Sequence, residues 1–351
     1  MDIKDFLREA VEKGASDLHI VAGLPPVLRV GGEIIFMDYE PLKPEDTKAL
    51  AYSLLNDEHK KKLESDLQLC HSITLEDIGR LRVAIYYRNA NPELAIRVCP
   101  KKIPSAGELN LPPIIDELTR KPHGLILITG PTGMGKTTTL NYMIDLINKE
   151  RRCKIVTIED PVEYIHSHKK SIVVQQELYT DTHSFNKALI HVLRQDPNVI
   201  AVGEMRDIET TATALTAAET GHLVIATLHT PDAAQTIDRI IDMFPSTQQH
   251  QVISQLSMCL QAIIAQLLLP RVDTQKRILA SEVLIATEAV RNIIREKKTT
   301  QLYSVIQTGR QLQMQSMDDC IAGLYEKGII TYDTAISKLR DRSILERIKR
   351  K

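Results

Sequence analysis

The sequence predicts an α/β protein in which a small α+β region precedes a larger region of alternating strands and helices. Three observations carry this prediction. The chain has 351 residues, and at roughly 150 residues per domain that length suggests two domains. Residues 1–100 contain short apolar runs separated by glycine and proline, as in strands joined by turns. From residue 124 onward, apolar runs alternate with amphipathic segments, which is typical of a parallel sheet with crossover helices.

The first region is expected to hold two helices and five short strands. The helices are predicted at 3–13, where an amphipathic segment stops near Gly14, and at 46–65. The strands are predicted at 18–21, 27–30, 34–37, 81–87 and 94–98. Residues 101–121 contain three prolines and one short apolar segment, so they are the best candidate for a linker. We therefore expect domains at 1–100 and 122–351.

The second region is expected to alternate between strands and helices first and to become helical later. Its strands are predicted at 124–129, 154–158, 172–175, 198–203 and 223–228. Its helices are predicted at 135–149, 184–195, 209–220 and 234–243. The remaining residues, 246–351, are expected to be mostly helical, with one strand at 278–285.

The composition argues against several classes of protein. Lys and Arg number 44 and Asp and Glu 45, a formal net charge of -1, whereas a protein that grips a long nucleic-acid track usually has a basic excess. Aromatic residues make up only 4%, with no Trp, so bases would find few stacking partners. The five cysteines are scattered without a C-x-x-C pair, which predicts neither a zinc site nor a disulfide framework.

The sequence also predicts a cytoplasmic protein without membrane insertion. Three of the first five residues are charged, where a signal peptide needs an apolar run. The most apolar later stretch, Leu256 to Pro270, is interrupted by Gln261 and Gln266 and is too short to span a bilayer. Docking on a membrane protein is compatible with these features.

One motif carries a specific chemical prediction. A segment that fits G-x-x-x-x-G-K-[ST] lies directly after the apolar run 125–128. Glycines let backbone N–H groups surround a β-phosphate, and the following helix points its positive end at that phosphate. Lys136 is expected to reach the β- and γ-phosphates, and the Thr137 hydroxyl is expected to ligate Mg²⁺. The residues predicted to bind ATP are Gly130, Pro131, Thr132, Gly133, Met134, Gly135, Lys136 and Thr137.

Two glutamates are candidates for the hydrolytic chemistry. Glu204 ends the apolar run 199–203, where a carboxylate can order Mg²⁺ or its water, although Asp is more usual at this position. Glu163 follows another apolar run and Pro161, which stops the strand. Glu163 is therefore expected in a loop at the carboxyl edge of the sheet, where ligands of open α/β sheets bind. We expect Glu163 to polarise the attacking water, although without the upstream motif this would be an ordinary surface loop.

Histidines bracket the last strand of the alternating region. His222 precedes the run 223–228 and His229 follows it. A histidine beside an apolar strand is more often a satisfied core residue than a working one, but His229 ends a strand of the same sheet and is placed to bond a γ-phosphate. His166 and His168 form an H-x-H pair without a third ligand in register, so we expect no metal there.

Four arginines lie on the strands that close the first region, Arg80, Arg82, Arg88 and Arg97. A phosphoryl-transfer site commonly receives an arginine from outside its own P-loop domain, since the planar guanidinium matches phosphate oxygens. Taken singly, each of these arginines is better explained as part of an exposed strand face.

Taken together, these motifs resemble the secretion ATPases that drive type II secretion and type IV pili, over nearly the whole chain. The similar segments are Gly14 to His19 (first-domain signature), Gly130 to Thr137 (Walker A), Thr157 to His166 (Asp box), Asp196 to Asp207 (Walker B) and Thr216 to Thr230 (His box). A further segment, Ala289 to Glu296, is similar to one that marks the pilus-retraction branch.

This resemblance implies a PAS-like first domain, a RecA-like second domain with a helical C-terminal part, and a homohexameric ring that binds ATP and Mg²⁺ between domains. The catalytic residues that it implies are Glu163, Glu204, His222, His229, Arg82 and Arg97, with Thr137 and Glu204 at the metal. Two positions depart from the family pattern. Met134 stands where a small residue is usual, and Pro231 where a polar residue is common. Because Met134 contributes its backbone to the loop, we expect ATP binding to survive.

The function favoured by the resemblance is an ATP-driven motor that retracts type IV pili and powers twitching motility. The partners that it implies are an inner-membrane platform protein and, as a further candidate, a paralogous retraction ATPase, with the ring at the inner face of the cell membrane. A pilus-assembly or type II secretion ATPase usually has a longer N-terminal region and a tetracysteine zinc module, and their absence favours retraction. An accessory retraction paralogue stays open. A hexameric nucleic-acid translocase is disfavoured by the charge balance and the scarce aromatics.

Overall fold

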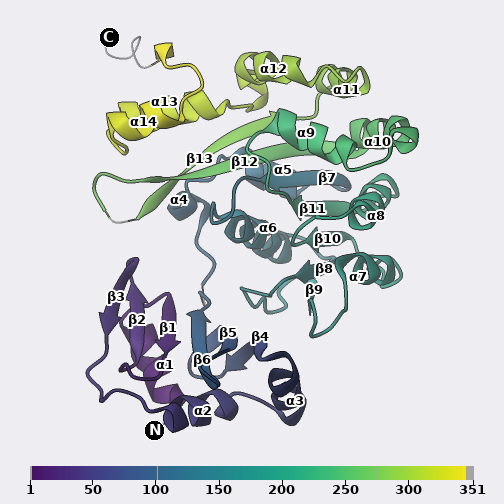
Figure 1. The fold of residues 1–351 in the computed structure, drawn as a ribbon. Coiled ribbons are helices and arrows are strands. Elements are labelled where there is room, and N and C mark those ends of the chain that lie inside the picture. Colours follow the sequence, from purple (N-terminus) through teal and green to yellow (C-terminus); the bar gives the residue numbers. More distant parts are fainter. Residues whose placement is uncertain (1, 101, 275, 345–351) are drawn as a thin grey trace. The chain divides into compact units, whose positions relative to one another are not determined.

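The computed structural model describes residues 2–100, 102–274 and 276–344 (Figure 1). The chain folds into two compact units. The first comprises residues 1–102 together with 161–165, and the second comprises 103–160 and 166–351. Within the described residues, no helix is long and apolar enough to cross a lipid bilayer.

The first unit is a six-stranded antiparallel sheet with three helices. Its strands lie in the order β3-β2-β1-β6-β5-β4, and they are β1 (Asp17–Ile20), β2 (Val27–Val30), β3 (Glu33–Phe36), β4 (Gln68–Leu75), β5 (Gly79–Arg88) and β6 (Asn91–Val98). The helices are α1 (Ile3–Glu12), α2 (Pro44–Ser53) and α3 (Asp57–Asp66). Two expectations need correction here. Residues 46–65 form two helices, because the Asn56 side chain accepts the His59 amide at 2.8 Å and starts a new helix. The sequence does not predict strand β4, since polar residues are as frequent along it as apolar ones.

Alternation along the strands separates the core of the first unit from its arginines. Leu81, Val83 and Ile85 of β5 are buried in one cluster with the apolar faces of the helices. Because successive strand residues point to opposite faces, Arg82 lies on the other side, where it is exposed and directly opposite Arg97 of β6.

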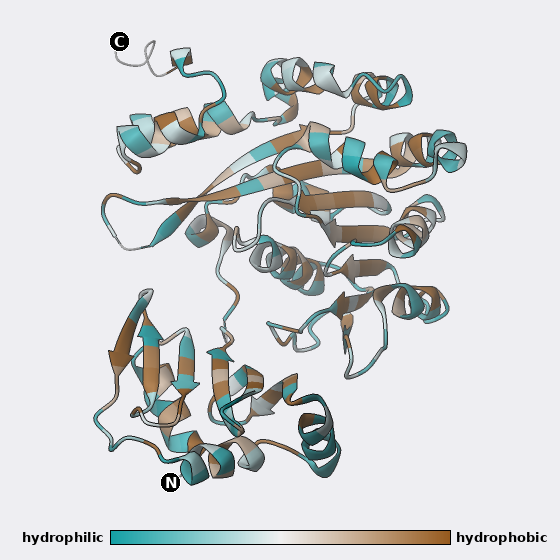
Figure 2. Ribbon diagram, in the orientation of Figure 1, coloured by the Kyte–Doolittle hydropathy of each residue, from teal (hydrophilic) through white to brown (hydrophobic). Residues whose placement is uncertain are grey.

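The second unit is built on a seven-stranded sheet in the order β13-β12-β7-β11-β10-β8-β9. Its strands are β7 (Gly124–Thr129), β8 (Lys154–Glu159), β9 (Ile172–Glu177), β10 (Val199–Val202), β11 (Leu223–Thr227), β12 (Leu260–Pro270) and β13 (Arg277–Ile285). The neighbours from β12 to β9 are all parallel, and only β13 runs antiparallel, beside β12. The brown strands of this sheet in Figure 2 are apolar, and all six residues of β7 are buried. Burial on both faces is typical of parallel strands.

Helices cover both faces of this sheet (Figure 1). Leu125 and Leu127 of β7 share a core with helices α7 to α10, while Ile126 and Ile128 share one with α5 and α6. The helices are α4 (Ala106–Leu109), α5 (Ile114–Thr119), α6 (Lys136–Glu150), α7 (Phe185–Val192), α8 (Ile208–Glu219), α9 (Ala233–Asp242), α10 (Ser246–Cys259), α11 (Glu288–Arg295), α12 (Leu302–Thr308), α13 (Met317–Glu326) and α14 (Tyr332–Lys338).

Two segments of the second unit differ from what the sequence predicts. Residues 101–121, expected as a linker, contain α4 and α5, because Pro113 starts α5 instead of breaking the chain there and Ile115 and Leu118 are buried in the core. The segment Leu260–Pro270, expected within a mostly helical region, is strand β12. Seven of the 11 residues of β12 are buried, five of them in a row from Ala262 to Gln266, so the segment has no apolar period that would separate a strand from a helix.

Candidate functional site

The predicted phosphate-binding loop connects β7 to α6, and its backbone requires glycine at both ends. Gly130 has a φ of 141°, and a Cβ built there would lie 2.4 Å from the carbonyl oxygen of Gln266. Gly135, the residue before α6, has a φ of 81°. L-residues with side chains rarely adopt such values. The loop therefore turns tightly and presents the N-terminus of α6, as an anion-binding loop needs.

Lys136 is folded back into this loop. Its side chain is buried, and Nζ donates to the carbonyl oxygens of Gly130 at 2.7 Å and Pro131 at 3.0 Å. Nζ also lies 3.3 Å from Nδ1 of His229. Burial lowers the pKa of Lys136 below its ordinary value, while the negative charge of Glu204 acts in the opposite direction. A phosphate group would give this ammonium the anionic partner that the loop carbonyls replace only in part.

Glu204 and His229 lie at the ends of neighbouring parallel strands and bond each other. Nε2 of His229 lies 2.8 Å from Oε1 of Glu204, and Arg206 donates to Oε2 at 2.7 Å. Because an ammonium can only donate, Nδ1 of His229 is the acceptor toward Lys136 and Nε2 carries the proton. Burial raises the pKa of Glu204, but the hydrogen bonds from Arg206 and His229 outweigh it and hold the pKa below the ordinary value. Glu204 is therefore an ionised carboxylate linked through His229 to Lys136.

Threonine side chains fix the strand ends that carry these residues. The Thr129 hydroxyl, directly before Gly130, bonds the Thr230 hydroxyl at 2.7 Å and also its carbonyl oxygen. Thr227 of β11 donates its hydroxyl to the Gly203 carbonyl at 2.5 Å. The carboxyl ends of β7, β10 and β11 are thus tied to one another next to the loop.

Strand β12, which the sequence does not predict, contacts both the phosphate-binding loop and helix α6. The Leu268 amide donates to the thioether of Met134 at 3.2 Å, and Gln266 donates to the Thr139 hydroxyl at 2.7 Å. From β13, Arg277 donates to the Gly133 carbonyl at 3.3 Å. The unusual Met134 therefore has a role in the structure, because its sulfur joins the loop to the neighbouring strand.

Sequence reasoning also gave no role to Arg206, although it lies two residues after Glu204 in the quoted motif. That spacing was the available signal. A basic residue two positions from a strand-end carboxylate can pair with it, and the structure shows this ion pair.

The oxygen donors expected for Mg²⁺ fit that ion. Thr137 lies in the first turn of α6, and the carboxylate of Glu204 is ionised at neutral pH. Magnesium is usually held by one or two protein oxygens, waters and substrate phosphates. Within the described residues there is no cluster of three or more His, Cys, Asp or Glu side chains that would hold a different metal.

His222 does not join this group. It precedes β11, with Nδ1 3.0 Å from the Ala217 carbonyl oxygen and its own carbonyl accepting the Gly124 amide at 3.0 Å. Six residues of nearly extended chain lie between it and His229, so seven steps of roughly 3.3 Å, or about 23 Å, separate the two histidines. His222 precedes the amino end of β11 and His229 follows its carboxyl end. Only His229 therefore lies at the end of the sheet where the phosphate-binding loop begins. Within this chain His222 therefore lies apart from Lys136 and Glu204, and its expected catalytic role stays a prediction.

The remaining candidates lie together in the first unit, with which residues 161–165 are grouped. Burial raises the pKa of Glu163, while the positive charges of Arg97 and Arg82 act in the opposite direction. Arg97 donates to Asp17 at 3.0 Å, whereas Arg88 is paired with the buried Glu93 at 2.6 Å. The structure therefore separates the arginines into a pair whose charges act on Glu163 and one that holds a core carboxylate.

The chain was compared with known proteins. The sequence profile of the family described as Type II/IV secretion system protein matches residues 108–333. The type IV pilus retraction ATPase PilT of Pseudomonas aeruginosa is 44% identical over 97% of this chain and 98% of its own length. A twitching motility protein of Neisseria gonorrhoeae is 42% identical over 95% of this chain and 89% of its own length.

Solved structures agree with these relatives. The crystal structure of the pilus retraction motor PilT with bound ADP has a TM-score of 0.93 at 48% identity, covering 99% of each chain. The ATPase DotB of Legionella pneumophila has a TM-score of 0.79 at 27% identity, covering 95% of this chain and 94% of its own.

Proposed function

Because this chain belongs to the Type II/IV secretion system protein family, we propose that it is an ATPase motor that powers type IV pilus retraction. The observation that carries the proposal is the continuous set of contacts from Lys136 through His229 to Glu204, next to a loop built to hold phosphate. The similarity to PilT over almost the full length of both chains supports the same function.

Each residue of the site has a chemical role in the proposed reaction. The loop amides and Lys136 bind the β- and γ-phosphates, and loss of the γ-phosphate removes the partner that His229 contacts. Glu163, whose pKa is raised by burial, accepts a proton from the attacking water. Arg82 and Arg97 neutralise charge that develops on the phosphoryl group. When Mg²⁺ is bound at Thr137 and Glu204, it adds charge neutralisation at the phosphate oxygens.

The motor is proposed to work as a homohexamer. The ring docks on a platform protein at the inner face of the cell membrane, and a paralogous retraction ATPase acts beside it. This chain is itself also similar to the PilU ATPase of Pseudomonas aeruginosa, with 39% identity over 96% of this chain and 88% of the PilU length. Hydrolysis changes the angle between the two domains, and this motion drives pilin subunits from the fibre back into the membrane.

The test separates retraction from assembly. A strain that lacks this protein is expected to keep surface pili, often in excess, and to lose twitching motility. Complementation with the unchanged gene restores twitching, and complementation with Lys136→Ala does not. A deletion strain without surface pili would point to assembly, and one with normal twitching would contradict the proposal.

A further inference from the structure

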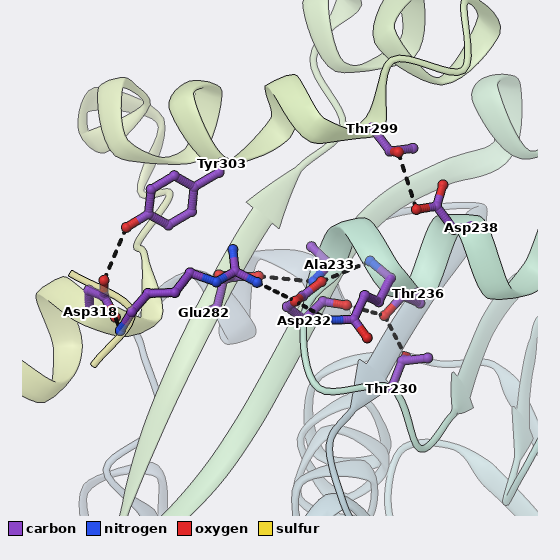
Figure 3. A network of polar contacts seen from close by, with 11 residues as sticks. Thr230, Asp232, Ala233, Thr236, Asp238, Glu282, Thr299, Tyr303 and Asp318 are labelled. Carbon is purple, nitrogen blue, oxygen red and sulfur yellow. Dashed lines mark hydrogen bonds and ion pairs between the residues drawn. The ribbon is translucent and has the colours of Figure 1, made fainter. Parts of the chain in front are cut away.

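The turn that carries His229 ends at a buried aspartate with two kinds of partner. Asp232 follows His229 by three residues and caps α9, since Oδ1 accepts the Gln235 amide at 2.8 Å. Its other oxygen, Oδ2, accepts a hydrogen bond from Arg340 at 2.7 Å. Arg340 lies 108 residues further along the chain, just after α14. A contact with the C-terminal region therefore reaches the N-cap of the helix that follows the His229 turn (Figure 3).

The same turn is bonded to the phosphate-binding strand. The hydroxyl of Thr230 lies 2.7 Å from those of Thr129 and Thr236. Thr236 donates in turn to the backbone carbonyl of Asp232 at 2.6 Å (Figure 3). The turn from His229 to Asp232 is thus held by Thr129 of β7 at Thr230 and by Arg340 at Asp232.

Arg340 is itself held in place by the C-terminal helices. Its guanidinium lies 5.3 Å from the centre of the Tyr303 ring, and its backbone amide donates to Asp318 at 3.0 Å. The Tyr303 hydroxyl donates to the same carboxylate at 3.1 Å, as Figure 3 shows. The Arg340 side chain is 56% exposed, but its backbone contact and the Tyr303 ring hold it in place, so it can restrain Asp232, whose side chain is 12% exposed.

Carboxylates surround the contact between Arg340 and Asp232. A cavity of about 250 Å³ is lined by Pro131 of the phosphate-binding loop and by the carboxylates Asp232, Glu282 and Asp318. Glu282 is buried and accepts the Ala233 amide at 2.9 Å. Without Arg340, Asp232 and Glu282 would keep their mutual repulsion and lose a nearby positive charge.

We propose that Arg340 is a positioning residue for the nucleotide site, because it holds Asp232 and thereby fixes the turn that places His229 beside Lys136. The proposal rests on the role given to His229 in the proposed function. Arg340 touches neither nucleotide nor reacting atoms. Through Arg340, turnover depends on the packing of α14 and the residues that follow it up to Arg340. Release of this segment would misplace His229 without disturbing the phosphate-binding loop.

The first test compares two arginine variants of the full-length protein. Arg340→Ala is expected to lower kcat about two- to thirtyfold, the usual range for coupling through a contact network. The affinity for ADP should stay close to that of the unchanged protein, since Lys136 and the loop are untouched. The matched control is Arg310→Ala, which removes an exposed 2.7 Å ion pair with Asp319 in the same region. Arg340→Lys should recover part of kcat, because it keeps the charge without the planar fork.

The second test does not depend on ATP hydrolysis. In the nucleotide-free protein, hydrogen exchange at the Gln235 and Thr236 amides should be faster in Arg340→Ala than in the unchanged protein or in Arg310→Ala. Unchanged exchange or unchanged kcat in Arg340→Ala would overturn the proposal, and so would an equal loss of kcat in both alanine variants. If the unchanged protein does not hydrolyse ATP, the proposed function fails, while the exchange experiment still decides whether Arg340 holds the turn.

Discussion

The two units hold their charged side chains in different ways. In the second unit, Lys136 lies after a fully buried strand, is only 8% exposed and is bonded to backbone carbonyls and to His229. In the first unit, Arg97 lies on the face of an antiparallel sheet, and 63% of its side chain is exposed. Charges of the first kind are fixed by burial and by hydrogen bonds. The loss of one such charge therefore leaves its buried partners without a hydrogen-bond partner. Charges of the second kind are screened by water and do little for stability, which leaves them available to an incoming anion.

The largest effect is expected from Lys136→Ala. This change removes the one ammonium in the loop, where electrostatic stabilisation of the phosphates dominates the chemistry, so ATP turnover should fall at least about a hundredfold. A steady-state phosphate-release assay on the purified variant measures it. Near-normal hydrolysis would mean that the buried charges of the second unit are structural, and the comparison between the units would lose its basis.

Substitution of either Glu163 or Glu204 by Gln should lower ATP turnover about a hundredfold and leave ATP binding largely intact, as expected when a positioned acid or base is removed. They should differ in pH dependence. A general base works only when deprotonated, and burial raises the pKa of Glu163, so the acid limb of the pH–rate profile should lie above the ordinary value of 4.5. Glu204 has a lowered pKa and stays ionised through that range. Residual activity above about a tenth in Glu163→Gln or Glu204→Gln would contradict the role of that residue.

The exposed arginines of the first unit should affect rate before affinity. A group that meets charge only in the transition state lowers kcat when it is lost and leaves nucleotide binding nearly unchanged. Arg97→Ala is therefore expected to reduce kcat at least about tenfold. Arg88→Ala is the matched control, because Arg88 is already paired with Glu93. The measurement is kcat beside the dissociation constant for ADP, at concentrations where the protein is assembled. An equal loss in both variants would show that the sheet face acts only through stability.

The histidines at the two ends of β11 sharpen the contrast within the second unit. His229→Ala removes a hydrogen bond to the ionised Glu204 and should lower kcat about tenfold, the value of a hydrogen bond to a charged group. His222 lies at the other end of β11. In dilute, unassembled protein, kcat of His222→Ala should therefore stay within about twofold of the unchanged protein's value. A loss that appears for His222→Ala only in the assembled protein would place His222 at a contact between subunits.

Most of the second unit's sheet follows from periodicity, including the edge strands β13 and β9, but strand β12 does not. Helices such as α6, α8 and α9 have one apolar face, and their bounds agree with the predicted ranges to within about a residue. Strand β12 lies in the interior of the sheet between β7 and β13, so its side chains are buried on both faces and give no period. Gln266 interrupts the apolar sequence of β12, yet it is buried and donates a hydrogen bond to Thr139.

The site was predictable where local sequence fixes the geometry and not where strand direction or distant contacts decide it. The glycines and Lys136 fall in one motif, and Glu204 and His229 each end a predicted strand. The direction of a parallel strand already separates His222 from His229, an argument that needed only the expected fold. The contact of Arg340 with Asp232 spans 108 residues and has no local signal in the sequence.

The smallest effect on turnover is expected from substitution of a buried histidine, His166, that contacts α6 at Asn141. His166 has its Nε2 2.8 Å from the Asn141 side chain, and burial lowers its pKa to about 4. The unfolded chain therefore binds a proton here at a higher pH than the folded chain does. Stability from this group is complete above the ordinary pKa of 6.5 and is lost as the pH falls toward 4.

The size of that loss can be measured by urea unfolding at two pH values. At about 1.4 kcal/mol per pKa unit, His166 should account for roughly 2 kcal/mol of the free energy of unfolding lost between pH 8 and pH 5. His166→Gln keeps an amide donor for Asn141 but cannot titrate, so its pH dependence should be shallower by about that amount, with ATP turnover at pH 8 little changed. The control is His191→Gln, an exposed position on α7. Equal slopes in the two variants would show that His166 takes up its proton without opening the structure. The polar contacts of α6 would then be as tolerant of charge as the exposed sheet face of the first unit.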